Sequence, residues 1–161
     1  MPLNVLVLCT GNSARSILGE MLFNHLGAGR IKAYSAGSKP GGVVNPVAIE
    51  TLQKHGIPCE GARSKSWDEF GAPDAPHFDF IFTVCSNAAN ETCPVWPGHP
   101  TTAHWTLPDP AHVEPMAARR EAFEVAYQSL RKRIEAFLAL PLESLSPQES
   151  ALAARRIHEE S

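Results

Sequence analysis

The chain has 161 residues, of which 43% are hydrophobic, 19% charged and 7% aromatic, a composition typical of one globular domain and not of a disordered chain. The net charge of −3 argues against a generally basic nucleic-acid binder, and no apolar run approaches the ~20 residues of a transmembrane helix. Because the N-terminus also lacks the features of a signal peptide, we expect a cytoplasmic protein with no nucleic-acid or membrane partner, whose four cysteines are reduced, catalytic or redox-active.

Strands and helices are predicted to alternate along most of the chain. The apolar run at residues 3–8 is typical of a strand buried on both faces, and residues 16–26 have the spacing of an amphipathic helix. Then follow a strand at 31–36, a helix from Pro46 to about His55, a strand at 78–84, a strand at 102–107 and a long helix at 115–140. This order predicts an α/β three-layer sandwich, in which helices cover both faces of a parallel sheet.

The end of the chain differs in character from the rest. We expect a domain at residues 1–140 and a C-terminal tail at 141–161, with a possible short helix from about residue 146 to 160. Its exposed charges suggest a loosely attached end.

The strongest functional signal is the segment between the first strand and the first helix. It places a cysteine and an arginine six positions apart across a loop of small residues, where backbone amides and the helix N-terminus can converge on an anion. The arginine can form two parallel hydrogen bonds to a tetrahedral oxyanion. The positive ends of the surrounding dipoles point at the cysteine and favour its thiolate form. We expect Cys9 to be a nucleophile, with an oxyanion bound by Thr10, Gly11, Asn12, Ser13, Ala14 and Arg15.

Residues 9–16 (CTGNSARS) resemble the phosphate-binding loop of the low-molecular-weight protein tyrosine phosphatases and of the arsenate reductases built on the same fold. The resemblance extends to Ser35-Ala36-Gly37 and Asp109-Pro110, and covers about residues 3–139. It implies a four-stranded parallel sheet with the phosphate loop after the first strand, and a hydrogen bond from Ser16 to Cys9. If this chain acts as the tyrosine phosphatases do, the resemblance implies that it uses Cys9, Arg15 and Asp109 to hydrolyse a phosphoprotein.

Several residues favour the arsenate reductases over the phosphatases. Cys85 follows the third strand and Cys93 lies eight residues later, so both can approach Cys9 at one edge of a parallel sheet. Reduction of arsenate requires two electrons and a second thiol, whereas hydrolysis of a phosphocysteine requires only water. Ala111 stands where the phosphatases usually carry an aromatic residue, and Glu20 stands where the reductases carry an acidic one.

Two features depart from the reductase pattern. Ala14 replaces a second cysteine that the reductases usually have inside the loop. The interval between Cys85 and Cys93 is also about one residue longer than in the thioredoxin-linked reductases, so the segment between them would have to move if they are to form a disulfide.

The resemblance implies a thiol relay. Arsenate, which phosphate or sulfate can mimic, binds the loop; Cys9 attacks it while Asp109 protonates the leaving oxygen. Cys85 then attacks Cys9, arsenite leaves, and Cys93 passes the oxidation on to thioredoxin. Alternatively, a small thiol such as glutathione (with glutaredoxin) or mycothiol resolves the adduct. A phosphatase and a non-enzymatic oxyanion-binding protein remain as alternative functions, and weak phosphatase activity beside reduction is expected.

We expect neither a metal ion nor a cofactor. The spacing of Cys85, Cys93, His99 and His104 does not match common structural zinc sites, and Cys59 is interpreted as a plain structural or surface thiol.

Asn12, Glu20 and Ser35 resemble positions that hold a potassium ion behind the loop in some thioredoxin-linked reductases. Here Lys65 aligns with a further, acidic ligand. We therefore expect the Lys65 ammonium to replace the cation.

Overall fold

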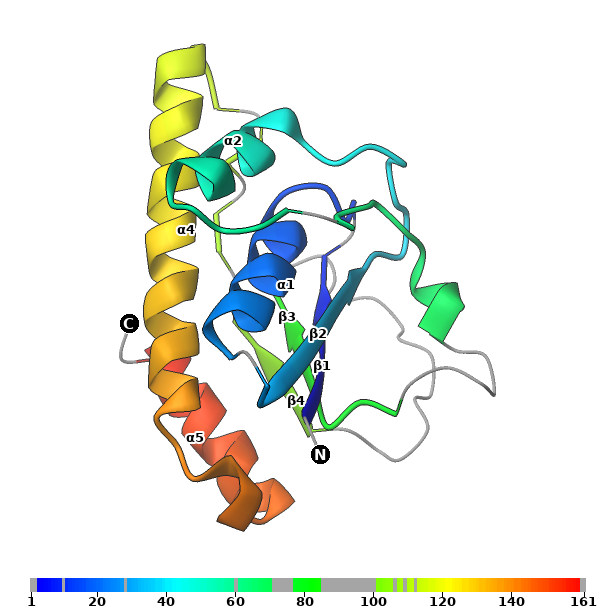
Figure 1. Ribbon diagram of the computed structural model, residues 1–161, viewed down its shortest axis with the longest axis vertical. Helices are drawn as coiled ribbons and strands as arrows, with labels where there is room; N and C mark the ends of the chain where they lie inside the picture. Colours follow the sequence, from blue (N-terminus) through cyan, green and yellow to red (C-terminus); the bar gives the residue numbers. More distant parts are fainter. Residues whose placement is uncertain are drawn as a thin grey trace.

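The computed structural model describes residues 3–9, 11–27, 29–59, 61–70, 77–84, 101–105, 107–108, 110–111 and 113–159 (Figure 1). The strands are β1 (Leu3–Leu8), β2 (Ile31–Ala36), β3 (Phe80–Thr83) and β4 (Thr101–His104). The α-helices are α1 (Arg15–Leu26), α2 (Pro46–Lys54), α4 (Met116–Leu138) and α5 (Pro147–Glu159), and two short 3-10 helices are η1 (Trp67–Phe70) and η2 (Leu142–Ser144). Each predicted strand and long helix is present, with ends that differ by a few residues.

All four strands are parallel, in the order β2-β1-β3-β4. In this register Leu8 lies opposite Ala36 on one side and Thr83 on the other, and Thr83 lies opposite His104. The carboxyl ends of the strands therefore meet at one edge of the sheet, which is where the loop after β1 begins. Within the described residues, this confirms the predicted parallel sheet of four strands.

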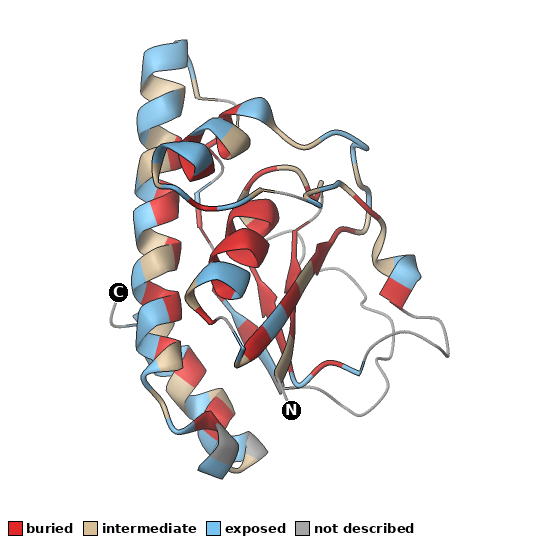
Figure 2. Cartoon of the chain, viewed as in Figure 1, coloured by how far each residue is buried: buried red, intermediate tan, exposed pale blue. Residues whose placement is uncertain are grey.

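The two faces of the sheet are buried in two separate clusters, because successive side chains of a strand point to opposite faces. Val5 and Val7 of β1 belong to the larger cluster, which α1 and α4 cover, and Figure 2 shows the buried residues of α4 on its side toward the sheet. Leu6 and Leu8 belong to the smaller cluster on the opposite face, where Phe70 of η1 packs. The predicted three-layer arrangement is thus confirmed.

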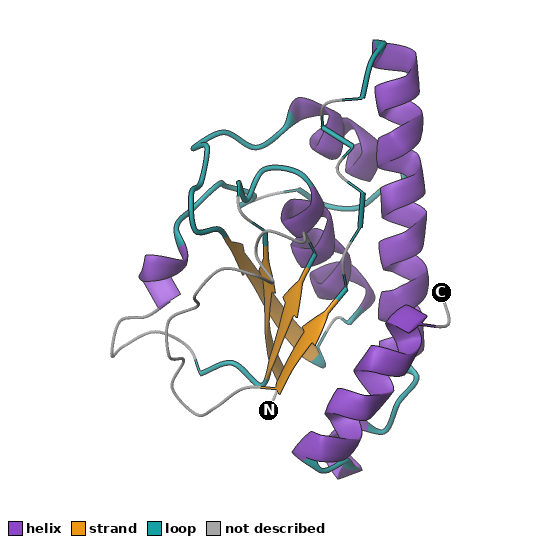
Figure 3. Cartoon of the chain, turned by 180° about the vertical axis from the view of Figure 1, so that it is seen from behind, coloured by secondary structure: helices purple, strands orange, loops and turns teal. Residues whose placement is uncertain are grey.

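The C-terminal segment is attached to the sheet, so the expectation of a loosely held end is wrong. Helix α5 packs against β4 and the end of α4, and Figure 3 shows it beside α4. Leu142 of η2 and Ser150 and Ala154 of α5 are buried, and Leu142 and Ala154 belong to the larger core cluster. A division of the chain at residue 140 stays a prediction.

None of the helices in the described ranges is long and apolar enough to span a lipid bilayer.

Candidate functional site

The loop after β1 brings Cys9 and Arg15 to the carboxyl edge of the sheet. Cys9 continues the β1 ladder, because its N–H donates to the Ala36 carbonyl at 3.2 Å, and it is 6% exposed. Residues 11–14 turn away from the strand, and α1 begins at Arg15. Thr10, which sequence analysis placed in the same loop, lies outside the described residues.

The outer side of the loop is held by neighbouring segments. The Gly11 carbonyl accepts from the Gly41 N–H at 3.2 Å, and the Ser13 carbonyl accepts from the Asn45 N–H at 2.9 Å. A trans peptide holds a carbonyl and the next N–H on opposite sides, so these bonds turn the N–H groups of Asn12 and Ala14 toward the inside of the loop. Inward amides at a helix N-terminus favour a bound anion.

Asn12 organises the loop from within. Its backbone is left-handed, with φ of 44°, a conformation that asparagine tolerates better than most residues. The side chain is fully buried: its Oδ1 accepts from the Lys65 backbone N–H, and its Nδ2 donates to the Ser16 hydroxyl, both at 2.8 Å. Ser16 is therefore fixed beside the loop, while its predicted hydrogen bond to Cys9 stays a prediction.

Arg15 is held by the segment that follows β4. Its Nη1 donates to the Leu107 carbonyl at 2.7 Å, and the Leu107 N–H donates to the Val84 carbonyl at 3.0 Å. Leu107 thus connects the predicted anion-binding guanidinium to the ends of β3 and β4. This contact could not be predicted from the sequence, because the acceptor is a backbone carbonyl, which every residue type carries.

A buried lysine lies behind the loop at the position predicted for it. The Lys65 ammonium donates to the Arg63 carbonyl at 2.9 Å and the Ser35 hydroxyl at 3.3 Å, and lies 3.5 Å from Glu20 Oε1. The Ser35 hydroxyl also donates to Glu20. The side chains of Lys65 and Glu20 are only 5% and 11% exposed. The ammonium therefore sits among oxygen atoms, as a bound cation would.

Burial and pairing act in opposite directions on this ion pair. Loss of solvent raises the pKa of Glu20 above its ordinary value, and the Lys65 charge and the Ser35 hydroxyl counteract part of that rise. Loss of solvent also lowers the pKa of Lys65, against the attraction of Glu20. Pairing thus opposes the loss of charge that burial favours at each residue, so the two titrations are coupled.

Four further residues from the sequence analysis are Cys59, Cys85, Cys93 and Asp109, of which the structure describes only Cys59. Cys85, Cys93 and Asp109 lie outside the described residues, so their catalytic roles stay predictions. Cys59 is a half-buried thiol that donates to the Ile57 carbonyl at 3.4 Å, and burial raises its pKa, which disfavours the reactive thiolate.

Metal-binding side chains do not gather in the parts of the chain that the structure describes. No group of three or more His, Cys, Asp or Glu residues lies close enough there to hold a metal ion. Of the four residues considered for a zinc site, Cys85, Cys93 and His99 lie outside those parts, whereas His104 is described.

Known proteins resemble this chain in both fold and sequence. The family model described as "Low molecular weight phosphotyrosine protein phosphatase" matches residues 4–151. A curated arsenate reductase of Shouchella clausii (strain KSM-K16) is 33% identical over 129 residues, covering 80% of this chain and 87% of that protein. One of Bacillus licheniformis is 36% identical over 129 residues, covering 79% of this chain and 86% of that protein.

Two solved structures extend the comparison. One is described as an arsenate reductase in the phosphate binding state; it has a TM-score of 0.65 and 27% identity and covers 85% of this chain and 97% of its own. The other is a low molecular weight protein tyrosine phosphatase from T. tengcongensis, with a TM-score of 0.69 and 22% identity, covering 85% of this chain and 98% of its own. At that identity the second likeness concerns the fold alone.

Proposed function

This chain belongs to the low-molecular-weight phosphotyrosine protein phosphatase family, and from that premise we propose that it is a thiol-dependent arsenate reductase. The observation that carries the proposal is the loop at the edge of the sheet, where Cys9 and Arg15 flank inward-turned amides. The curated relatives at 33–36% identity are arsenate reductases, which supports arsenate as the oxyanion that this loop receives.

In the first step the Cys9 thiolate attacks the arsenic atom. A sulfur–arsenic bond forms and one oxygen leaves as water, after Asp109 donates a proton to it as general acid. The inward amides and the Arg15 guanidinium neutralise charge on the remaining oxygens. The Leu107 carbonyl holds that guanidinium in place, and Asn12 holds the loop in its left-handed turn.

The second step transfers two electrons. The Cys85 thiolate attacks Cys9 sulfur, the sulfur–arsenic bond breaks, and its electron pair stays on arsenic, which leaves as arsenite. Cys93 then attacks Cys85 and releases Cys9 as a thiolate. Thioredoxin reduces the resulting Cys85–Cys93 disulfide. In a variant of this scheme, the thiolate of glutathione or mycothiol attacks Cys9 sulfur in place of Cys85, the sulfur–arsenic bond breaks, and arsenite leaves with its electron pair. The mixed disulfide left on Cys9 is then reduced by a second thiol, which glutaredoxin supplies when the small thiol is glutathione.

The alternative function is phosphoprotein hydrolysis by Cys9, Arg15 and Asp109. The family model supports it, since its description is that of a phosphotyrosine phosphatase. Phosphate and arsenate share shape and charge, so the loop suits either anion. The two functions differ in their need for the two later cysteines.

Turnover by cysteine variants separates these functions. Arsenate reduction with thioredoxin, and hydrolysis of an aryl phosphate, are measured for Cys85→Ser, Cys93→Ser and, as control, Cys59→Ser. The relay predicts that the first two variants lose arsenate turnover while the control keeps it. Full arsenate turnover by both would contradict the relay. Aryl phosphate hydrolysis without any arsenate reduction by the unaltered protein would establish the phosphatase instead.

A further inference from the structure

We propose that the C-terminal helix α5 is a positioning element for Arg15, acting through Trp105 and Leu107. The matched family model ends at residue 151, inside α5 (Pro147–Glu159), so most of this helix extends beyond the family pattern. The inference rests on the proposed anion site, and does not depend on the later relay.

The first connection joins α5 to the end of β4. The Trp105 indole Nε1 donates to the Ala154 carbonyl at 2.9 Å, and both residues are fully buried. The Trp105 ring also lies 4.1 Å from the Phe82 ring and 6.0 Å from the Phe137 ring, measured between centroids. The ring is thus confined by the core, and its one polar atom is held by α5.

The backbone of Trp105 is held as firmly as its ring. Its N–H donates to the Thr83 carbonyl at 2.7 Å, and its carbonyl accepts from Arg133 Nη1 at 3.2 Å. Arg133 comes from α4 and is only 7% exposed. The position of Trp105 is therefore determined jointly by β3, α4 and α5.

The second connection runs from Trp105 to the anion site. Leu107 lies two residues farther along the chain. Its N–H donates to the Val84 carbonyl, and its carbonyl accepts from Arg15 Nη1. Because Leu107 lies so close to Trp105 along the chain, we expect a displacement of Trp105 to move the Leu107 carbonyl as well. Because that carbonyl holds one arm of the guanidinium, Arg15 would turn with it.

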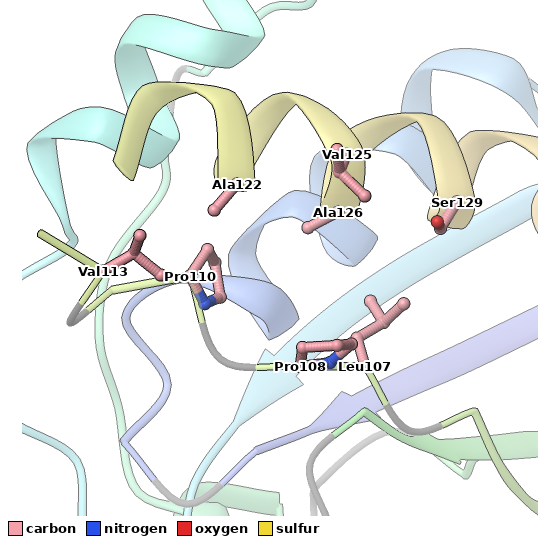
Figure 4. Close-up of a pocket in the computed structure, with 8 residues that line it drawn as sticks. All are labelled: Leu107, Pro108, Pro110, Val113, Ala122, Val125, Ala126 and Ser129. Carbon is pink, nitrogen blue, oxygen red and sulfur yellow. The ribbon is translucent and has the colours of Figure 1, made fainter. Parts of the chain in front are cut away.

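The side of this segment that faces α4 borders a partly open apolar pocket. A pocket of about 200 Å³ separates the segment after β4 from α4 (Figure 4). The lining is almost entirely apolar, and α4 contributes only small or short side chains to it. The lining residues are Leu107, Pro108, Pro110, Val113, Ala122, Val125, Ala126 and Ser129.

Next to this pocket the segment is held by the hydrogen bonds of Trp105 and Leu107. A guanidinium binds an oxyanion well only when its planar fork has the right direction, so a change at α5 should alter anion affinity.

The test measures inorganic phosphate binding to full-length variants. Bound phosphate should protect Cys9 from alkylation. The rate of Cys9 alkylation is therefore measured at increasing phosphate concentration, by mass spectrometry of the peptide that contains Cys9, and gives the phosphate Kd. Trp105→Phe keeps an aromatic ring and removes the indole donor. The phosphate Kd should rise by up to about five-fold, which corresponds to the full contribution of one such hydrogen bond. Ala154→Leu, which displaces α5 from the indole, is the second variant, and Leu152→Ala on the exposed side of α5 is the control.

A second background shows whether the effect passes through Arg15. When Trp105→Phe is introduced into Arg15→Ala protein, it should no longer change the phosphate Kd. Trp105→Phe should still lower the melting temperature, both in this background and in the unaltered protein. An unchanged Kd in Trp105→Phe and Ala154→Leu, or an equal rise with and without Arg15, would overturn the role of α5 alone. Failure of the unaltered protein to bind phosphate would instead overturn the anion site and this inference together.

Discussion

Replacing Lys65 with methionine would leave the Glu20 carboxylate buried without its cation. The pair is separated by 3.5 Å, and both side chains are almost wholly shielded from water. Removing one member of a buried pair typically costs about 3–5 kcal/mol, because the other charge stays behind uncompensated. At about 2–4 °C per kcal/mol for a chain of this size, the melting temperature of Lys65→Met should fall by roughly 6–20 °C. Thermal unfolding followed by circular dichroism measures the shift.

Two further variants make the reasoning refutable. Lys54→Met removes an exposed lysine whose ammonium lies 3.4 Å from Glu124, and such surface pairs contribute about 0–1 kcal/mol. The double variant Glu20→Gln with Lys65→Met should recover much of the lost stability, because it leaves no unpaired charge. If Lys65→Met lowered the melting temperature no more than Lys54→Met, the account of a buried ammonium behind the loop would be wrong.

Three other predictions concern the same part of the molecule. Because the Lys65 ammonium already lies among the oxygens of Glu20, Ser35 and Arg63, activity and melting temperature should be equal in sodium and potassium chloride of the same concentration, and a strong gain in potassium alone would contradict this. Burial raises the pKa of Glu20, so the native state retains its proton to higher pH than the unfolded chain does; the stability of the unaltered protein relative to Glu20→Gln should be largest below about pH 4.5 and decline as pH rises through the native pKa, as urea titrations across pH would show. Asn12→Ala should weaken phosphate binding more than Asn12→Gly, because only glycine accepts the left-handed backbone readily, and isothermal calorimetry that ranked them in the reverse order would exclude backbone geometry as the cause.

The sheet and the loop were predictable because their signals are local. The apolar run at residues 5–8 of β1 indicates a central strand, and small residues between that strand and a helix indicate an anion loop. Helix α1 itself is buried over eight consecutive residues, so it is not the amphipathic helix that its spacing predicted. The pairing of Lys65 with Glu20 joins residues 45 positions apart, and only the resemblance to a known family pointed to it.

The attachment of α5 was missed for a physical reason. Its buried contacts use Ser150 and Ala154, which carry little hydrophobic signal, and its hydrogen bond uses a backbone carbonyl. The Leu107 contact with Arg15 is of the same kind. Residue types report side-chain chemistry, so positioning through backbone carbonyls becomes visible only in three dimensions.

A single-turnover reaction tests the proposed reductase most directly. Pre-reduced protein, freed of small thiols, is mixed with arsenate, and the arsenite formed and the protein thiols remaining are counted. The relay predicts that each chain forms one arsenite and loses two thiols. The Cys9→Ser variant should form no arsenite and lose no thiols. Arsenite that forms only after glutathione or mycothiol is added would assign the second thiol to an external partner. No arsenite under either condition would contradict arsenate reduction by this chain.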